Sequence, residues 1–263
     1  MKAVEIMEEL FALADERDYS NTCDTLKAGN PDVEVKKVAV SMHPTLEVVE
    51  QVKNWGAQLL IVHEPAYYNH MDEHSDEKIE CEKRKIIEDS GITIYRYHDY
   101  PHNTTPDIIA EGQLRAMDFK GTVEYTGKFD LVRIHLDEPM TPVEVAKWIE
   151  DHCNIKHIRI CGTRDKKCTV VSGMFGSPGL RALDELYNEK CEILLIGETQ
   201  EWRFGEYARD ADYLGYKKAV LILGHMGSER DGMVYTADML KKMHPELEVE
   251  YIECGEVCTY TDS

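Results

Sequence analysis

The chain has 263 residues with 50 acidic and 30 basic side chains, and its formal net charge is −20. This length is sufficient for one large α/β domain or two smaller lobes with a buried core. So acidic a surface repels phosphate backbones and anionic lipid, which argues against nucleic-acid or membrane binding through a basic face. It does not exclude a small anionic ligand held by a metal, because a bound cation reverses the local field.

The termini and cysteines indicate a cytoplasmic protein. Residues 1–10 read as an acidic amphipathic helix and not as the apolar core of a signal peptide. No apolar run approaches the roughly twenty residues of a membrane span. Eight cysteines are scattered without a CxxC pair, and the closest couple is Cys254 and Cys258. We therefore predict reduced thiols, not a disulfide framework or a zinc ribbon.

The first part of the chain alternates between expected helices and strands. A helix is expected at about 2–15, and a polar, turn-rich segment follows it. Strands are expected at 33–41, 57–62 and 92–97, and helices at 44–55 and 77–90, with Gly56 and Gly91 ending the helices.

The second part begins with a linking region from about 103 to 140, with an alternating strand between 129 and 135. Thr141, Pro142 and Glu144 form a helix start with a capping box. Segments 155–161 and 167–172 flank a polar turn, which predicts a hairpin.

Two blocks of the sequence resemble each other. Residues 36–64 and 166–198 both read as strand, helix and strand ending in glutamate, and in both cases the next strand ends in histidine. We interpret this as a duplicated β-α-β-α-β unit, although two ordinary βαβ units could resemble each other by chance. The fold class predicted is α/β, with two similar β-α-β lobes of mixed sheets facing each other across a metal site. The lobes would be about 1–125 and 126–263 of a single domain, 1–263.

Parallel strands with right-handed crossovers end at the same edge of a sheet. Two lobes facing each other would bring the side chains that follow these strands toward one cleft. They are His63, Glu64, His98, Glu198 and His225.

His63 and Glu64 end a buried apolar strand at Pro65. Adjacent residues on a regular strand face opposite sides, so both reach one site only if the strand ends there, and Pro65 supplies that ending. The alternative is one ligand beside a solvent-exposed acid.

His225 and Glu229 follow another apolar strand, and their spacing places them on one helix face. Imidazole nitrogen and carboxylate oxygen suit a divalent transition metal. The alternative is a helix start with Ser228 as N-cap and Glu229 as an ordinary acid of the first turn.

Three further segments contain candidate residues. His98 and His102 are candidates after the strand at 92–97, and Asp99 could orient one of them; the alternative is a polar loop. The histidine- and acid-rich segment 69–74 could supply a lid or substrate contacts. The glycine loop 172–179 could hold a phosphate, but it lacks the P-loop lysine, so a sterically demanding turn is the preferred interpretation.

Together these motifs resemble the Nif-three-like family, also called dinuclear-metal-centre proteins, some of which carry the name GTP cyclohydrolase I type 2. The resemblance covers nearly the whole chain and indicates the short form of the family. It rests on the strand followed by His-x-Pro, the Tyr-x-x-His after the next strand, the Gly-Glu strand end, and Gly-His-x-x-x-Glu.

The resemblance implies two divalent ions per chain (Zn, Fe, Mn, Co or Ni). The implied metal ligands are His63, Glu64, His102, His225 and Glu229. Glu64 stands where a second histidine is usual and His102 where an aspartate is usual, so ligand count and charge are kept. His98, Asp99 and Glu198 would orient ligands or transfer protons.

The predicted function is that of a dinuclear metal-binding protein, a metal-dependent hydrolase of a small phosphate- or carbonyl-bearing substrate. The ions would acidify a water and clamp a leaving oxygen. One alternative is ring opening of GTP, which requires a purine pocket that the sequence does not identify. Another is a metal-binding or chaperone-like oligomer without turnover. The resemblance also implies a homohexamer.

Overall fold

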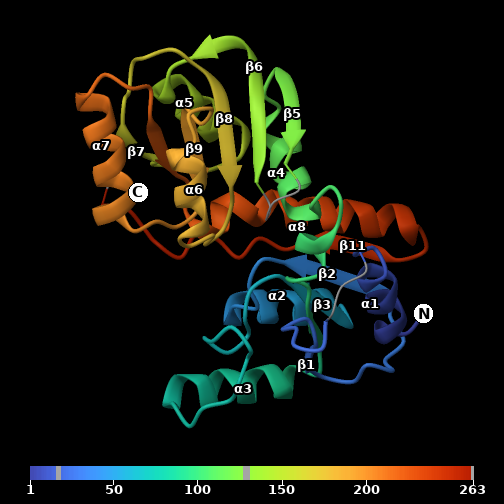
Figure 1. Cartoon of the computed structure of the whole chain (residues 1–263). Helices are drawn as coiled ribbons and strands as arrows, with labels where there is room; N and C mark the ends of the chain where they lie inside the picture. The colour runs from blue at the N-terminus through green and yellow to red at the C-terminus, as the bar shows by residue number, and fades with distance from the viewer. Residues whose placement is uncertain (16–18, 127–130, 262–263) are drawn as a thin grey trace. The chain divides into compact units, whose positions relative to one another are not determined.

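The computed structural model describes residues 1–15, 19–126 and 131–261 (Figure 1). Its contacts divide the chain into two compact units. The first consists of Met1–Ile109 with Gly232–Ser263, and the second of Ala110–Asp231. The chain passes between the units within helices α4 (Ile108–Met117) and α8 (His225–Met243).

The first unit is built on a five-stranded sheet with the order β1-β4-β3-β2-β11. Strands β2, β3, β4 and β11 are parallel, and β1 is antiparallel to β4. The strands are β1 (Leu26–Ala28), β2 (Lys37–Ser41), β3 (Leu59–Val62), β4 (Thr93–Arg96) and β11 (Glu248–Tyr251). The helices are α1 (Ala3–Phe11), α2 (Leu46–Trp55) and α3 (Lys78–Ser90), with a 3-10 turn, η1, at Pro101–Asn103.

Local sequence signals explain these elements. All residues of β3 and β4 are buried, as expected for central strands of a parallel sheet. Thr45 accepts a hydrogen bond from the Val48 N–H at the start of α2. Gly56 and Gly91 adopt φ of 78° and 71° after α2 and α3, which confirms their predicted role as helix ends.

The second unit is built on a six-stranded sheet with the order β5-β6-β8-β9-β10-β7. Strands β8, β9 and β10 are parallel, and β5, β6 and β7 pair antiparallel with their neighbours. The strands are β5 (Gly121–Tyr125), β6 (Val132–Met140), β7 (Arg159–Gly162), β8 (Cys168–Met174), β9 (Ile193–Ile196) and β10 (Ala219–Ile222). The remaining helices are α5 (Pro142–His152), α6 (Arg181–Tyr187) and α7 (Glu206–Tyr213), with a π-helix, η2, at Glu201–Gly205.

The predicted duplication agrees with the topology. In each unit three consecutive strands run parallel, β2-β3-β4 in one and β8-β9-β10 in the other. The third strand then pairs with an antiparallel edge strand, β1 beside β4 and β7 beside β10. The chain is therefore an α/β protein with two mixed sheets, as predicted.

The predicted hairpin is wrong. Strand β7 pairs with β10, whereas β8 pairs with β6 and β9, so the two segments around the turn 162–165 are not neighbours in the sheet. The polar segment 162–165 is a turn, as predicted. It connects β7, at one edge of the sheet beside β10, to β8, which lies between β6 and β9. The capping box at α5, with Thr141 and Glu144, is confirmed.

The predicted linking region, 103–140, contains more helix and strand than expected. It contains helix α4 and strand β5, and the predicted strand at 129–135 is β6, starting at Val132; residues 127–130 lie outside the described part. Strand β11 pairs with β2, so the C-terminal segment belongs to the first unit. The units are thus divided at other points than the predicted lobes, 1–125 and 126–263.

All eight cysteines are free thiols. Among the described helices, none combines the length and the apolar character that crossing a membrane requires.

Candidate metal-binding groups

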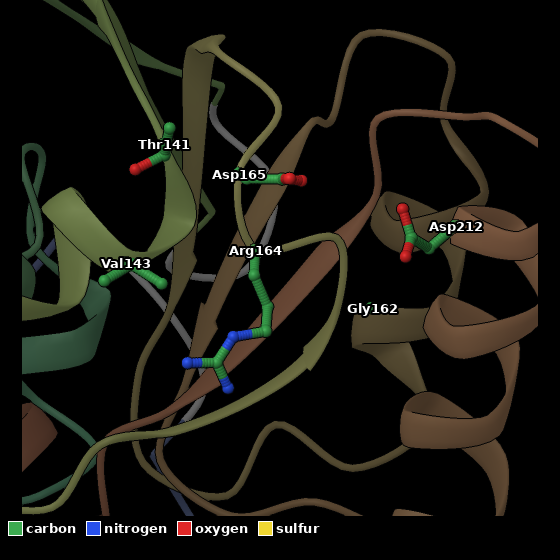
Figure 2. A pocket seen from close by; sticks show the side chains of 6 residues that line it. All are labelled: Thr141, Val143, Gly162, Arg164, Asp165 and Asp212. Carbon is green, nitrogen blue, oxygen red and sulfur yellow. The ribbon is translucent and has the colours of Figure 1, made fainter.

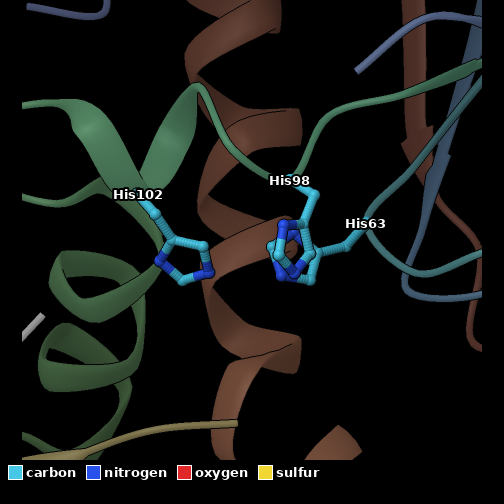
Figure 3. A group of neighbouring side chains, drawn as sticks. All are labelled: His63, His98 and His102. Atoms are coloured by element: carbon cyan, nitrogen blue, oxygen red, sulfur yellow. The ribbon is translucent and has the colours of Figure 1, made fainter. Parts of the chain in front are cut away.

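Three histidines meet in the first unit, at the carboxyl ends of its central strands. His63 follows β3 directly, His98 lies two residues after β4, and His102 is within η1. The ring of His63 is 4.6 Å from that of His98 and 5.2 Å from that of His102. One ligand atom from each ring lies within 4.8 Å of the others. Figure 3 shows the three rings gathered in this way, so they can share one ion.

Oxygen atoms orient all three rings. The Nδ1 atom of His63 lies 3.0 Å from the Tyr97 carbonyl oxygen, that of His98 3.0 Å from Asp99 Oδ1, and that of His102 2.8 Å from Asp107 Oδ2. Carbonyl and carboxylate oxygens accept hydrogen bonds, so Nδ1 carries the proton in each ring. Nε2 is then the nitrogen that could bind a metal ion, and oxygen partners of this kind are typical of metal-binding histidines.

The electrostatics favour a neutral imidazole at His63 and an ionised carboxylate at Asp99. Burial lowers the pKa of His63 well below its ordinary value, and His98 and His102 lower it further. Burial alone would raise the pKa of Asp99, but hydrogen bonds from His98 and Thr22 outweigh it and hold the pKa far below its usual range. A neutral imidazole is the form that binds a metal.

Glu64 pairs with a cation that the sequence analysis missed. Arg96 is fully buried at the end of β4, and its Nη2 lies 3.8 Å from Glu64 Oε2. Its Nε donates to the His63 carbonyl oxygen at 2.9 Å, and its Nη1 is 3.5 Å from Asp72 Oδ2. Arg96 therefore balances the charge of the buried Glu64. The sequence did contain a signal for this role, since Arg96 is the single charged residue in the otherwise uncharged strand at 92–97.

The segment 69–74 is an irregular loop, and its aspartate has a structural role. Asp72 is buried, forms a 2.9 Å ion pair with Lys27 and accepts a 2.9 Å hydrogen bond from the Tyr67 N–H. These contacts fix the loop beside Arg96. His70 of the same loop lies with its ring 5.4 Å from that of His98.

The second unit contains another group, around the start of α8. His225 Nδ1 lies 2.8 Å from Glu198 Oε1, and its Nε2 lies 3.2 Å from Glu229 Oε2. Glu229 is 4% exposed. The predicted helical spacing thus places His225 and Glu229 side by side, and Glu198 orients the imidazole, as expected for a ligand's partner.

Ser228 is not the N-cap of this helix. Helix α8 begins at His225, and the Ser228 hydroxyl donates to the His225 carbonyl oxygen at 2.8 Å and accepts from the Gly176 N–H at 2.9 Å. The alternative, with Ser228 as the N-cap, is therefore wrong, because the helix already begins at His225.

The glycine loop lies against Glu229. Gly176 has φ of +62°, and a Cβ at this position would lie 2.1 Å from Glu229 Oε1. A Cβ on Gly197 would lie 2.3 Å from the Gly176 carbonyl oxygen. These contacts support the steric interpretation of the loop, since only glycine permits the backbone to approach this closely.

A surface pocket of the second unit is a separate feature (Figure 2). It has a volume of about 480 Å³ and is lined by Thr141, Val143, Gly162, Arg164, Asp165 and Asp212. Asp212 Oδ1 forms a 2.7 Å ion pair with Lys166 Nζ. The candidate ligands are not among the residues that line this pocket.

Two groups thus gather most of the predicted site residues, one in each unit. The first unit brings together His63, His98 and His102, and the second brings together His225, Glu229 and Glu198. The placement of both groups at one cleft stays a prediction. Arg96 and Asp107 were not predicted, because neither lies in a motif, although both are near a histidine in sequence.

Comparison with known proteins identifies a family that this sequence resembles over nearly its whole length. The sequence model of the Duf34/NIF3 family (NGG1p interacting factor 3) matches residues 1–256. A Clostridium perfringens protein named GTP cyclohydrolase 1 type 2 homolog is 20% identical over 263 residues, which covers 96% of this chain and 95% of the relative.

Two solved structures share the fold. A protein called ybgI, of unknown function, has a TM-score of 0.78 at 21% identity and covers 98% of this chain and 100% of its own. Staphylococcus aureus protein SA1388 has a TM-score of 0.74 at 16% identity, with 99% of both chains covered.

Proposed function

Because the chain belongs to the Duf34/NIF3 family and gathers two groups of metal-competent side chains, we propose that it is a metal-dependent hydrolase with two divalent ions per chain. The substrate class is small molecules with a phosphate or carbonyl group. The observation that carries the proposal is the three-histidine group, in which each Nδ1 faces an oxygen acceptor.

The donor set fits a transition metal. Imidazole nitrogens with carboxylate oxygens suit Zn, Fe, Mn, Co or Ni. Such ions supply Lewis-acid chemistry, since they acidify water and polarise a phosphoryl or carbonyl oxygen. The proposed ligands are His63, His98 and His102 in the first unit, with Glu64 beside them, and His225 and Glu229 in the second.

The chain's own groups would orient these ligands and move protons. Asp99 and Asp107 fix the tautomers of His98 and His102, and Glu198 orients the ring of His225. Glu198 is exposed, so it can exchange a proton with solvent. Arg96 balances Glu64, which keeps the first group from accumulating negative charge.

Elemental analysis of protein purified without chelator or histidine tag tests the metal part. We expect about two ions per chain at these two groups, and at least one of these two lost in each of two double variants, His63→Ala/His102→Ala and His225→Ala/Glu229→Ala. The control is His135→Ala/His152→Ala, which removes two exposed imidazoles. Retention of both ions in the His225→Ala/Glu229→Ala variant would contradict the proposal.

A second candidate is ring opening of GTP, favoured by the name of the Clostridium perfringens relative. A third is a metal-binding oligomer without turnover. Metal-loaded protein assayed with phosphomonoesters, phosphodiesters, amides and GTP separates the three. Hydrolysis of the simple substrates supports the first, consumption of GTP alone the second, and no turnover the third.

We further propose a cytoplasmic homohexamer, in keeping with the free cysteines and the family resemblance. Light scattering coupled to size-exclusion chromatography would give the mass of the assembly. A monomeric mass would contradict the hexamer.

A further inference from the structure

Another group of potential ligands lies next to the three histidines of the first unit. It consists of Cys23 before β1, His70 in the loop after β3, and Asp99 after β4. One ligand atom from each of the three lies within 4.8 Å of the others. Three separate segments thus supply a sulfur, a nitrogen and an oxygen to one place.

The thiol of this group is in the interior. Cys23 is 1% exposed, and its Sγ donates a 3.5 Å hydrogen bond to Asp24 Oδ1. Asp24 is committed elsewhere, since it also accepts from the N–H groups of His98 at 2.7 Å and Tyr100 at 2.9 Å. The loss of the thiol proton would therefore leave the hydrogen bonds that hold the loop after β4 intact.

Asp99 has capacity for an ion as well. A carboxylate offers about four acceptor positions. Asp99 Oδ2 accepts from the Thr22 hydroxyl at 2.7 Å and from the Cys23 N–H at 3.2 Å, and Oδ1 accepts from His98 Nδ1 at 3.0 Å. These bonds fix the carboxylate and, counted over the described residues, use three of its acceptor positions.

His70 opens the group to solvent. It is exposed, unlike Cys23, so an ion can reach the buried thiol past its ring. The positive charge of Arg96 opposes the binding of a cation here, because its Nη1 donates to the His70 carbonyl oxygen and so lies close to the group. However, Arg96 already forms ion pairs with Glu64 and Asp72, which offset its charge. The two negative charges of a Cys23 thiolate and the Asp99 carboxylate would balance the charge of a divalent ion.

We propose that Cys23, His70 and Asp99 bind one Zn²⁺ ion, separate from the ions at the histidine group. Sulfur, nitrogen and oxygen donors are the ligands that Zn²⁺ takes in proteins, and three protein ligands leave the fourth position open to water or a small ligand. On binding, the Cys23 sulfur forms a bond to the ion, and the thiol proton passes to solvent.

Cobalt substitution tests the site directly. A thiolate bound to Co²⁺ gives a sulfur-to-metal charge-transfer band in the near ultraviolet, which histidine and carboxylate ligands do not give. We expect this band in the wild-type protein and its loss in Cys23→Ser, together with about one metal equivalent. The control is Cys258→Ser, which removes an exposed thiol and is expected to keep the band.

A second variant covers the case in which Cys23→Ser fails to fold. His70→Ala changes an exposed side chain, and we expect it to weaken Co²⁺ binding at this site by more than the roughly 10- to 100-fold that loss of a ligand's hydrogen-bond partner costs. His74→Ala removes an exposed imidazole from the same loop and should bind as the wild type does.

The outcomes separate this site from the proposed function. A band that persists in Cys23→Ser, or no band in the wild type, overturns the zinc site whatever the histidine groups bind. A band that disappears in Cys23→Ser but persists in His63→Ala/His102→Ala supports the site even if the hydrolase proposal fails.

Discussion

At the scale of single residues, the glycine loop shows how closely the backbone encloses a candidate ligand. Gly176 combines a positive φ of +62° with a neighbour, Glu229, whose Oε1 would lie 2.1 Å from an added Cβ. Gly179 has almost the same φ, +61°, but nothing lies within 4 Å of its Cβ position. Substitution of Gly179 therefore tests backbone strain alone, whereas substitution of Gly176 tests strain together with a steric clash.

Gly176→Ala should therefore destabilise the protein more than Gly179→Ala. The left-handed conformation costs a non-glycine residue about 1 kcal/mol in both variants. Displacement of the buried Glu229 should add about 2 kcal/mol in Gly176→Ala alone. Urea denaturation would measure both free energies of unfolding. Equal losses in the two variants would show that Glu229 moves aside without cost.

At the scale of elements, a buried ion pair joins β6 and β8 to helix α6. Arg133 donates to Glu185 through Nε at 2.8 Å and Nη2 at 2.6 Å, and the Ser172 hydroxyl donates to Glu185 Oε1 at 2.6 Å. Burial alone would raise the pKa of Glu185, but the hydrogen bonds and charge of Arg133 and the Ser172 bond lower it overall.

This shift predicts a pH dependence of stability. Because the folded-state pKa of Glu185 lies below its unfolded value, the stabilisation is complete above the unfolded value, about 4.3, and is lost as the pH falls through the folded value. Glu185→Gln should lower the free energy of unfolding by about 2 kcal/mol at pH 7, and by less at pH of about 3. Denaturant titrations at both pH values check this.

The control for that experiment is Glu189→Gln, which changes an exposed glutamate two residues after the end of α6. It should reproduce the wild-type pH dependence. If Glu185→Gln keeps the same difference from the wild type at both pH values, the pair with Arg133 does not lower the pKa of Glu185 in solution.

At the scale of the whole molecule, both units end their central parallel strands in metal-competent side chains. If these groups bind ions in the folded state alone, metal binding and folding are linked. An ion present at a thousand times its dissociation constant stabilises the native state by about 4 kcal/mol. For a chain of this length, that corresponds to a change in Tm of about 10 °C.

Chelation should thus lower Tm by about 10 °C, and added Zn²⁺ or Co²⁺ should restore it. Thermal melts followed by circular dichroism would measure the change. The His135→Ala/His152→Ala control should respond as the wild type does, and His63→Ala/His102→Ala should respond less. An unchanged Tm of the wild type after removal of all metal would contradict the link.

The sequence by itself determined the parts of this protein that depend on local chemistry. Buried apolar runs determined β3 and β10, glycines determined the ends of α2 and α3, and spacing placed His225 beside Glu229. Strand pairing could not be deduced in the same way, because a polar turn between β7 and β8 is compatible both with a hairpin and with a crossing to β10. Only the tertiary structure decided that pairing, and only it brought Arg96, Asp107 and Cys23 to the three histidines. Arg96 meets His63, and Cys23 meets Asp99, across long stretches of sequence. Asp107 is near His102 in sequence but lies in no motif, so its contact follows from how this loop folds.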